Sequence, residues 1–311
     1  MGTNVLIEKH GSDRDNNSDL WRWLEGEVHV HANGLLYTGR NSRIYTCRDQ
    51  KTGTPRVVKF VTTDERRDEL RWEIDIIGRL QGHANILRCY HIYESALETC
   101  FLSEYCAAGD LRVYINRTGG LGNDGACSIF ISVARALAFM HSRNIIHRDI
   151  KPDNVFITLG GDVRLGDFGF ARYFPPDEMN HDSYGSLPYA APELLDPVFR
   201  PCMPKPLDLW SAGVLLYVTL YACPLADSKL SQARLYEYLL YHEIDYDILP
   251  KCGTYTVEPM AINLLKQLLR LDPMTRLSAS AMIHHPWFVE NGKAPPSPHR
   301  RSHSVPNIVT A

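Results

Sequence analysis

The sequence contains no hydrophobic run long enough to cross a membrane. Its best candidate, S-A-G-V-L-L-Y-V-T-L-Y-A at residues 211–222, is shorter than the roughly 20 apolar residues of a spanning helix, so we expect a buried helix and no membrane association. The eight cysteines form no C-x-x-C pair, and no signal peptide is recognisable. Both observations favour reduced thiols in the cytoplasm or the nucleus. The formal net charge is only -3, so bulk electrostatics give no reason to expect nucleic-acid binding.

The remaining composition is that of a globular protein. Hydrophobic residues make up 44% of the 311 positions and charged residues 22%, which argues against a mostly disordered chain. The length suits one large domain or two medium ones. Beta-prone runs separated by turn signals at N-G (33–34) and K-T-G-T-P (51–55) predict the first three strands of an antiparallel sheet over residues 27–61. Apolar residues at helical spacing predict helices ending near residue 82 and over residues 124–141.

One stretch, I-H-R-D-I-K-P-D-N at residues 146–154, concentrates acidic, basic and amide side chains behind an apolar helix. Asp167 follows in D-F-G, 18 residues after Asp149. Residues 155–165 contain two β-prone runs around Gly-Gly, which predicts a hairpin that folds the chain back. The hairpin would bring Asp149, Asn154 and Asp167 to one spot. Carboxylate and amide oxygens are hard ligands, suited to Mg²⁺ carrying phosphates.

H-R-D-x-K-x-x-N followed by D-F-G resembles the catalytic and metal-binding loops of eukaryotic protein kinases. The run G-S-L-P-Y-A-A-P-E-L-L looks most like checkpoint-type kinases of the calmodulin-dependent group. The resemblance implies an α+β fold of two lobes, a small antiparallel sheet with one helix and a larger, mostly helical lobe. It divides the chain into a polar extension (1–33), a kinase domain (34–288, with lobes 34–106 and 107–288) and a disordered tail rich in Pro, Ser and Arg (289–311). Residues 1 to about 25 are expected to be mobile, with Trp21 and Trp23 anchoring this segment to the first lobe.

The resemblance implies a role for each charged residue of these motifs. Asp149 accepts or orients the proton of a substrate hydroxyl, and Lys151 steadies the γ-phosphate of ATP. Lys59 anchors the inner phosphates and is oriented by Glu73, fourteen residues later on a helix. The implied Mg²⁺ ligands are Asn154 and Asp167.

The predicted nucleotide site departs from the family in its glycine-rich loop. Where the family has G-x-G-x-x-G-x-V over the ATP phosphates, this sequence has Tyr37, Gly39 and Ser42 at the glycine positions. A Cβ at two of them restricts how closely the backbone approaches a phosphate. The segment E-Y-C (104–106) resembles the hinge that hydrogen-bonds adenine. The implied nucleotide contacts are Gly39, Ile44, Val57, Lys59, Glu104, Cys106, Asp110, Phe156 and Asp167.

The filled catalytic positions favour an ATP- and Mg²⁺-dependent serine/threonine protein kinase. Lys151 and Ser186 are typical of serine/threonine rather than tyrosine kinases. The altered glycine loop leaves open a pseudokinase that acts as an interaction scaffold. A small-molecule phosphotransferase with a kinase-like fold is the third candidate, although such enzymes lack the A-P-E segment and the peptide-docking helices.

The resemblance also implies a substrate preference and two structural contacts. Asp110, Asp153 and Glu237 match acidic positions that receive arginines upstream of the target Ser or Thr, which predicts a basic-directed kinase. In the second lobe, Asp208 would hold the catalytic loop through its backbone. A buried ion pair is expected between Glu193 and Arg276.

Asp182 lies where many relatives carry an activating phosphothreonine, and Arg148 and Arg172 match the cations that bind that phosphate. We expect Asp182, alone or with a phosphate on Ser183 or Tyr184, to supply the negative charge. The alternative is an exposed acid in a mobile loop.

The tail contains a possible protein-binding motif. The spacing of Arg301, Ser304 and Pro306 resembles the phosphoserine motif bound by 14-3-3 proteins. Short basic Ser-Pro motifs also arise by chance in disordered tails.

Overall fold

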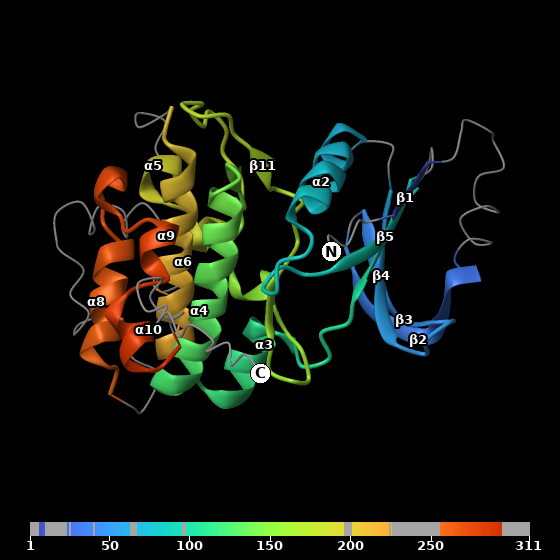
Figure 1. The fold of residues 1–311 in the computed structure, drawn as a ribbon, viewed down its shortest axis with the longest axis horizontal. Coiled ribbons are helices and arrows are strands. Elements are labelled where there is room, and N and C mark those ends of the chain that lie inside the picture. Colours follow the sequence, from blue (N-terminus) through green and yellow to red (C-terminus); the bar gives the residue numbers. More distant parts are fainter. Residues whose placement is uncertain are drawn as a thin grey trace, which may run out of the picture.

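A six-stranded sheet forms the N-terminal lobe of the computed structural model (Figure 1). The structure describes residues 6–9, 24, 26–39, 41–62, 67–94, 98–195, 201–223, 225 and 256–293. The strands lie in the order β1-β5-β6-β4-β3-β2, and neighbours are antiparallel except for β1 and β5. Their bounds are β1 Leu6–Lys9, β2 Val28–Thr38, β3 Ser42–Asp49, β4 Pro55–Thr62, β5 Cys89–Glu94 and β6 Glu98–Glu104.

Strand β4 divides its side chains between two hydrophobic cores because successive residues point to opposite faces. Val58 and Phe60 are buried in the core of the N-terminal lobe. Val61 faces the other way and joins the larger core. Lys59 shares the face of Val61, so its side chain points away from the N-terminal core. The other buried members of that core are Leu24, Val28, Cys47, Tyr93, Cys100 and Leu102.

The predicted turn at Asn33-Gly34 is wrong, because both residues lie inside strand β2. The pairing of β2 with β3 changes register between Val30 and Leu35, which marks an irregularity of the bulge type. A Cβ on Gly34 would collide with the side chain of Thr46. Gly34 therefore allows close approach of two strands rather than reversal of the chain.

The prediction that residues 1 to about 25 lack structure is wrong for Leu6–Lys9. These residues form β1, which pairs in parallel with β5 from Leu6 opposite His91 to Lys9 opposite Glu94. The pairing adds a strand at the edge of the sheet (Figure 1). Trp21 and Trp23, which we expected to anchor this segment, lie outside the described residues.

Helix α2, Arg67–Leu80, packs its predicted apolar stripe inward. Leu70, Ile74, Ile77 and Leu80 are all buried, as the three-to-four-residue spacing requires. This stripe belongs to the larger core together with Val61 of β4. The helix is thereby fixed against the sheet that carries Lys59.

The C-terminal lobe is mostly helical, and two small sheets hold the loops that face the N-terminal lobe (Figure 1). Strands β7, β9 and β10 form one sheet, and β8 pairs with β11 in the other. The strand bounds are β7 Gly109–Asp110, β8 Ile145–Ile146, β9 Val155–Ile157, β10 Val163–Leu165 and β11 Arg172–Tyr173. The helices are α3 Leu111–Thr118, α4 Gly122–His141, α5 Pro192–Leu195, α6 Pro204–Tyr221, α8 Pro259–Leu268, α9 Ala279–Met282 and α10 Pro286–Glu290, with short 3₁₀ turns η1 Pro152–Asn154, η2 Leu187–Tyr189 and η4 Pro273–Thr275.

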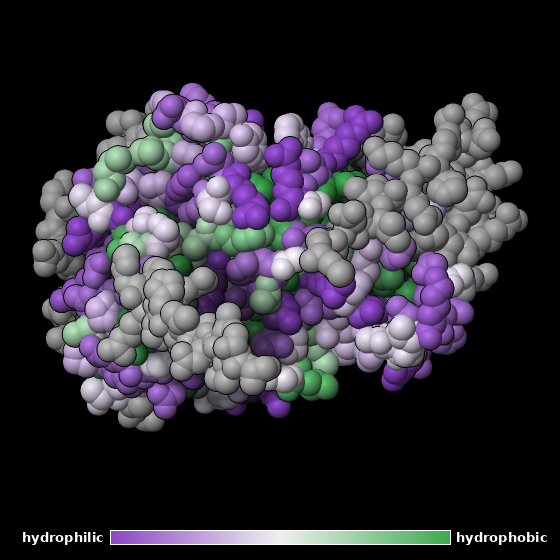
Figure 2. All heavy atoms as spheres, in the orientation of Figure 1, coloured by the Kyte–Doolittle hydropathy of each residue, from purple (hydrophilic) through white to green (hydrophobic). Residues whose placement is uncertain are grey.

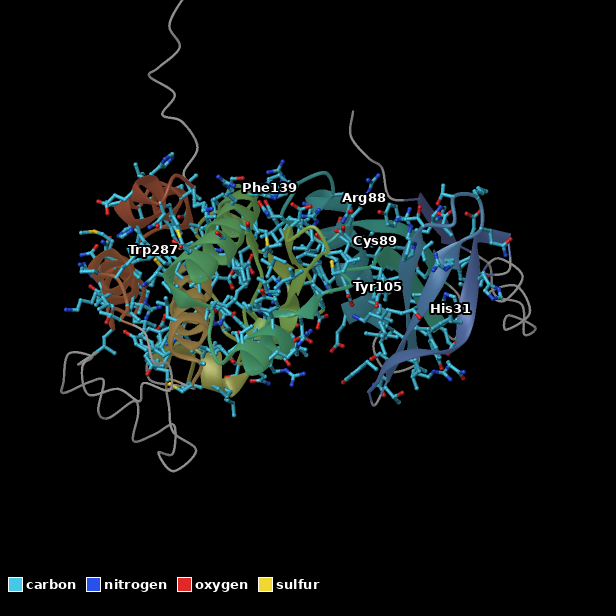
Figure 3. The ribbon with its side chains drawn as sticks, turned by 90° about the horizontal axis from the view of Figure 1, so that it is seen from below. His31, Arg88, Cys89, Tyr105, Phe139 and Trp287 are labelled. Carbon is cyan, nitrogen blue, oxygen red and sulfur yellow. The ribbon has the colours of Figure 1, made fainter. Side chains whose placement is uncertain are left out.

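Helix α6 is buried on nearly all sides, which explains its continuous apolar sequence. A Cβ on Gly213 would lie 2.7 Å from the Leu269 side chain, so glycine allows the segment after α8 to approach closely. Trp287 lies among the C-lobe helices (Figure 3) and is fully buried. No helix in the described ranges is long and apolar enough to span a bilayer.

The expected buried ion pair is present in this lobe. Arg276 Nη2 lies 2.8 Å from Glu193 Oε2, and the Arg276 side chain is fully buried. The predicted tail boundary at residue 289 is too early, because α10 continues to Glu290 and Arg135 donates to the carbonyl of Lys293 at 2.7 Å. Residues 294–311 lie outside the described residues. The face shown in Figure 2 is largely hydrophilic, with scattered hydrophobic residues between the polar ones.

Candidate active site

Lys59, Glu73 and Asp167 meet where the two lobes face each other. Lys59 Nζ lies 3.2 Å from Glu73 Oε1 and 3.5 Å from Asp167 Oδ1. Glu73 comes from α2 and its side chain is only 8% exposed. The expected lysine–glutamate ion pair is therefore formed, and it connects the sheet, helix α2 and the D-F-G segment.

Charge pairing favours the ionised forms of Lys59 and Asp167. Burial by itself would lower the pKa of Lys59, but the carboxylates of Glu73 and Asp167 hold that pKa above its usual value. The Lys59 ammonium in turn lowers the pKa of Asp167, against the opposing effect of burial. Asp167 is therefore a carboxylate at neutral pH, the form that a cation requires.

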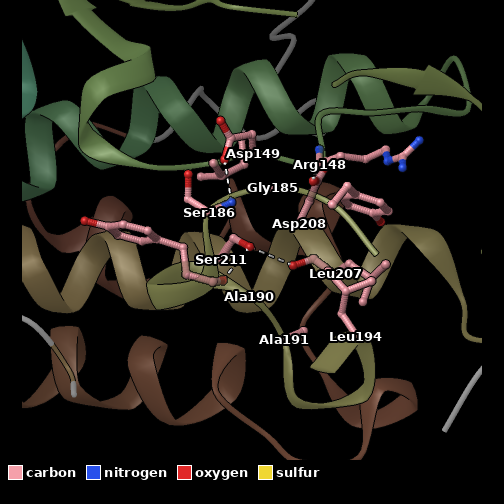
Figure 4. A pocket seen from close by; sticks show the side chains of 13 residues that line it. Arg148, Asp149, Gly185, Ser186, Ala190, Ala191, Leu194, Leu207, Asp208 and Ser211 are labelled. Carbon is pink, nitrogen blue, oxygen red and sulfur yellow. Dashed lines mark hydrogen bonds between the residues drawn. The ribbon is translucent and has the colours of Figure 1, made fainter. Parts of the chain in front are cut away.

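The side chain of Asp149 is held from three sides. Lys151 Nζ donates to Asp149 Oδ2 at 2.7 Å, and Asn154 Nδ2 donates to the same oxygen at 3.1 Å. The backbone N–H of Ser186 donates to Asp149 Oδ1 at 3.0 Å (Figure 4). Lys151 Nζ also donates to Ser186 Oγ at 2.8 Å. These contacts fix the position of the proposed proton acceptor and join it to the segment carrying Ser186.

The backbone of this loop is held by Asp208 of α6, as predicted. The N–H groups of His147 and Arg148 donate to its two carboxylate oxygens at 2.8 Å each. His141 Nε2 lies 2.9 Å from Asp208 Oδ2. Burial tends to raise the pKa of Asp208, but the hydrogen bond from His141 and the charges nearby keep it below its usual value.

The predicted hairpin brings the two implied Mg²⁺ ligands together. Strands β9 and β10 pair in register from Val155 opposite Leu165. The N–H of Gly166 then donates to the carbonyl of Asn154 at 3.0 Å, which places Asp167 beside the Asn154 segment. Asp167 adopts the left-handed conformation, with φ 58°.

The donor set fits Mg²⁺. The Asn154 amide nitrogen is turned toward Asp149, so its carbonyl oxygen is directed elsewhere, and the Asp167 carboxylate is 47% exposed. Mg²⁺ usually takes one or two protein oxygens and completes its shell with water and substrate phosphates. Within the described part of the chain, no group of three or more His, Cys, Asp or Glu residues could hold a metal by itself.

The nucleotide residues predicted on the sheet share one face. Ile44 lies opposite Lys59 in the β3–β4 pairing, and cross-strand partners point to the same side. Val57 lies two residues before Lys59 on β4 and faces the same way. Gly39 closes the turn between β2 and β3, where its N–H donates to the carbonyl of Ser42 at 2.8 Å. A Cβ on Gly39 would lie 2.9 Å from the exposed Tyr37 ring, so a larger residue there would require this ring to move aside.

The remaining nucleotide residues lie at the connection between lobes, near Arg88 and Tyr105 in Figure 3. None of the hydrogen bonds found in the described part of the chain uses the backbone N–H of Cys106, which leaves this donor available to a ligand. Asp110 caps α3 by accepting from the N–H of Val113 at 2.8 Å. Phe156 lies opposite Asp110 in the β7–β9 pairing.

Sequence reasoning missed the role of Arg164 at this connection. Arg164 Nε donates to Glu104 Oε1 at 3.0 Å, and the same oxygen accepts from the N–H of Arg88 at 2.9 Å. The Glu104 side chain therefore ties the hinge to the β9–β10 hairpin. No motif signals this contact, since it depends on the register of two separate sheets.

Of the two arginines expected to face the negative charge, Asp182 contacts Arg172 and not Arg148. It pairs with Arg172 at 3.3 Å, and its side chain is 58% exposed. The Arg148 guanidinium instead lies over the ring of Tyr184, 3.4 Å from the ring centre. The Tyr184 hydroxyl is buried, so the expectation of a phosphate on this residue is not supported by the folded arrangement.

The acidic residues expected to receive substrate arginines are partly occupied. Arg112 Nε donates to Asp153 Oδ1 at 2.6 Å, and the two side chains are 55% and 38% exposed. The Asp153 carboxylate raises the pKa of Arg112, with a smaller contribution from Asp110. Glu237 lies outside the described residues.

This arrangement matches a known family. A model described as "Protein kinase domain" matches residues 30–288, most of the chain. The chain belongs to the protein kinase family. The bilobal α+β fold predicted from its motifs is confirmed.

Similar curated proteins include plant protein kinases. Calcium-dependent protein kinase 27 of Oryza sativa subsp. japonica is 32% identical over 272 residues, covering 85% of this kinase and 43% of that protein. Calcium-dependent protein kinase 2 of Arabidopsis thaliana is 31% identical over 271 residues, covering 85% of this kinase and 41% of that protein. The chain thus spans less than half the length of these two relatives. Neither is a checkpoint kinase, so that finer resemblance stays a prediction.

The Lys59–Asp167 contact predicts that the stability of this kinase depends on pH through the ionisation of Asp167. Since the pKa of Asp167 is depressed, its ionisation stabilises the fold above its unfolded pKa of about 3.9, and this contribution is lost as the pH falls through the lower folded value. Lys59→Met should raise the pKa of Asp167, because burial then acts unopposed by Lys59. Carboxyl NMR titration in metal-free buffer measures it. Lys51→Met, at a lysine whose side chain is 72% exposed, is the control, and an unchanged Asp167 titration in Lys59→Met would contradict the prediction.

Proposed function

We propose that this protein kinase transfers the γ-phosphate of ATP to serine and threonine hydroxyls of protein substrates, with Mg²⁺ as cofactor. The observation that carries the proposal is the set of three ion pairs formed around the site. Lys59 reaches both Glu73 and Asp167, and Asp149 is held by Lys151. Phosphoryl transfer depends mainly on positioning and charge neutralisation, and these contacts support both.

Each side chain has a proposed task in the transfer. Asp149 accepts or orients the proton of the incoming hydroxyl, while Lys151 lies beside it as a cation for the transferred phosphate. Lys59 binds the inner phosphates and is kept in place by Glu73. Bound Mg²⁺, held by Asn154 and Asp167, would neutralise phosphate charge.

The contact between Lys151 and Ser186 supports serine/threonine specificity. Lys151 Nζ donates to Ser186 Oγ at 2.8 Å, so the small hydroxyl residue completes the support of the catalytic loop. Both residues are typical of serine/threonine kinases by resemblance. The similarity to calcium-dependent protein kinases agrees with this assignment.

A pseudokinase scaffold is the second candidate, favoured by the glycine-rich loop. Tyr37 and Ser42 replace two glycines, and the Tyr37 side chain projects from the loop, with 55% of the residue exposed. A scaffold would need neither phosphate binding nor the Lys59–Glu73 contact. It therefore predicts no Mg-ATP binding by the wild-type protein.

Transfer of radiolabelled phosphate to a generic basic peptide distinguishes these candidates. Asp149→Ala should reduce kcat by about 10²–10⁴-fold, since proton acceptance and orientation are lost.

Asp167→Ala should abolish Mg²⁺-dependent transfer, and a chelator should do the same to the wild type. Ser42→Gly should leave transfer intact or raise it. Asp124→Ala, at an exposed carboxylate on α4, is the matched control, and wild-type protein that neither binds Mg-ATP nor labels any substrate would support the scaffold.

We also propose that the kinase prefers substrates with basic residues upstream of the target hydroxyl. Asp110 and Asp153 lie close enough for both to raise the pKa of Arg112, so they form one acidic area beside α3. Arg112 occupies Asp153 in the absence of substrate and would compete with an incoming arginine.

Removing this competition should sharpen the preference. The Arg112–Asp153 pair is exposed, and such pairs are worth up to about 1 kcal/mol, or about fivefold in binding. Arg112→Ala should therefore increase selection of upstream arginine by about two- to fivefold, whereas Asp153→Ala should decrease it. Arg117→Ala, at an exposed arginine of the same helix, controls for net charge. A peptide library in which neither variant changes upstream selection, or in which wild type shows none, counts against the proposal.

A further proposal concerns Arg301–Pro306, which lies outside the described residues. Phosphorylation of Ser304 would add about -1.5 to -2 charge and create a motif for a 14-3-3 protein, which could retain the kinase in the cytoplasm or nucleus. Pull-down with recombinant 14-3-3 protein should succeed only for phosphorylated protein and fail after phosphatase treatment or in Ser304→Ala. Binding that survives both treatments rules the motif out.

A further inference from the structure

The activation segment is the stretch between D-F-G (167–169) and A-P-E (191–193). Three of its consecutive residues contact the catalytic loop (147–154). Tyr184 lies under the Arg148 side chain, and Gly185 lies against the Arg148 carbonyl. Ser186 bonds to the side chains of Asp149 and Lys151. The segment and the loop therefore run alongside each other in one defined register (Figure 4).

Gly185 sets this register. Its φ is +78°, a conformation that favours glycine, and an added Cβ would lie 2.5 Å from the Arg148 carbonyl oxygen. Only glycine allows the segment to approach this closely. Because the next residue is anchored on Asp149, the preceding residue, Tyr184, is directed to the Arg148 guanidinium.

Arg148 has an aromatic partner where an anion was expected. Its guanidinium carbon lies 3.4 Å from the centre of the Tyr184 ring. Among the described residues, no carboxylate lies within 4.0 Å of Arg148, and Asp182 pairs with Arg172 instead. A cation over an aromatic face is attracted by the ring quadrupole, and more strongly when both are removed from water.

The small cavity beside this pair has no room for a phosphate. The cavity lined by Arg148, Tyr184 and Leu194 has a volume of about 10 Å³, room for about one water molecule (Figure 4). The Tyr184 hydroxyl is buried and the residue packs against the main hydrophobic core. Arg148 itself is half-buried, and a cation that is partly withdrawn from water without a partner is costly.

We propose that Tyr184 is a positioning residue whose ring face holds Arg148, and through it the catalytic loop, without a phosphate on the activation segment. The inference rests on the proposed kinase activity. Arg148 precedes Asp149 directly and has a φ of 71°, a strained conformation for a non-glycine residue. A partner for its side chain helps to keep that conformation, and with it the position of the Asp149 carboxylate. An aromatic ring, unlike a phosphate, is present from synthesis onward.

The experiment compares wild type, Tyr184→Phe and Tyr184→Leu, each treated with phosphatase and checked by intact mass. Wild type without phosphate should be as active as untreated wild type. Tyr184→Phe keeps the ring and should stay within about twofold in kcat, whereas Tyr184→Leu keeps apolar volume without the ring face and should lose about tenfold. The Kd for Mg-ATP should stay unchanged in both, because Lys59 and Glu73 are untouched. A lower kcat with an unchanged Kd for Mg-ATP in Tyr184→Leu distinguishes loss of positioning from general unfolding.

Two further variants serve as comparisons. Tyr90→Leu removes another arginine–tyrosine contact, in which Arg56 and Arg88 lie 3.7 and 4.8 Å from the ring centre on strand β5 of the N-terminal lobe, and should leave kcat unchanged. Asp182→Ala removes the exposed pair with Arg172 and should change kcat less than Tyr184→Leu does.

Several results would overturn the inference. The first is a wild type that is active when phosphorylated and inactive after phosphatase treatment. The second is an equal kcat for Tyr184→Leu and wild type, and the third is an equal loss of kcat in Tyr184→Phe and Tyr184→Leu. If Tyr184→Leu does not fold, the phosphatase comparison and Tyr184→Phe still decide the matter. A wild type that transfers no phosphate in either state would overturn the proposed function as well, whereas an active wild type with an unaffected Tyr184→Leu overturns this inference alone.

Discussion

The site depends on one buried carboxylate, that of Asp208. Its two oxygens accept the backbone N–H groups of His147 and Arg148, and without this acceptor one buried and one partly buried donor would lose their partner at once. The bonds also hold Arg148 in a left-handed conformation that its side chain disfavours. Asp149 follows immediately, so its direction is set by a residue nearly sixty positions later in the chain. Helix α6 is almost entirely buried, which gives Asp208 a rigid support.

The two lobes are joined by contacts that lie close to the site. The N–H of Leu87 donates to the carbonyl of Leu165 at 2.8 Å, and the N–H of Leu165 donates to Asn85 at 2.9 Å. Two residues after Leu165 comes Asp167, which reaches Lys59 of the other lobe. Backbone bonds between the lobes and a charge pair thus act on the same short segment. A change in the angle between the lobes would alter the Lys59–Asp167 distance before it affected either core.

The sequence was sufficient for the contacts that motifs encode, and insufficient for those that depend on register. Lys59 with Glu73, Asp208 with the catalytic loop and Glu193 with Arg276 all follow from short patterns in a fixed order. Asn33-Gly34 misled, because the same dipeptide serves a tight turn and a bulge, and only the neighbouring Thr46 decides between them. The partners of Asp153, Glu104 and Arg148 could not be predicted either. These partners are Arg112, Arg164 and Tyr184. Each lies on a different element, and whether its side chain reaches the site depends on how the elements pack.

Strand β1 protects the kinase against aggregation through the edge of its sheet. The outer edge of β5 would otherwise present unpaired N–H and C=O groups, a template on which another extended chain can add and begin aggregation. Leu6–Lys9 occupies that edge, although it is separated from β5 by some eighty residues. Because this pairing closes a much longer loop than the β5–β6 pairing, we expect it to form after β5 and β6 have met. The edge is therefore open during synthesis and early folding, and closed only in the finished protein.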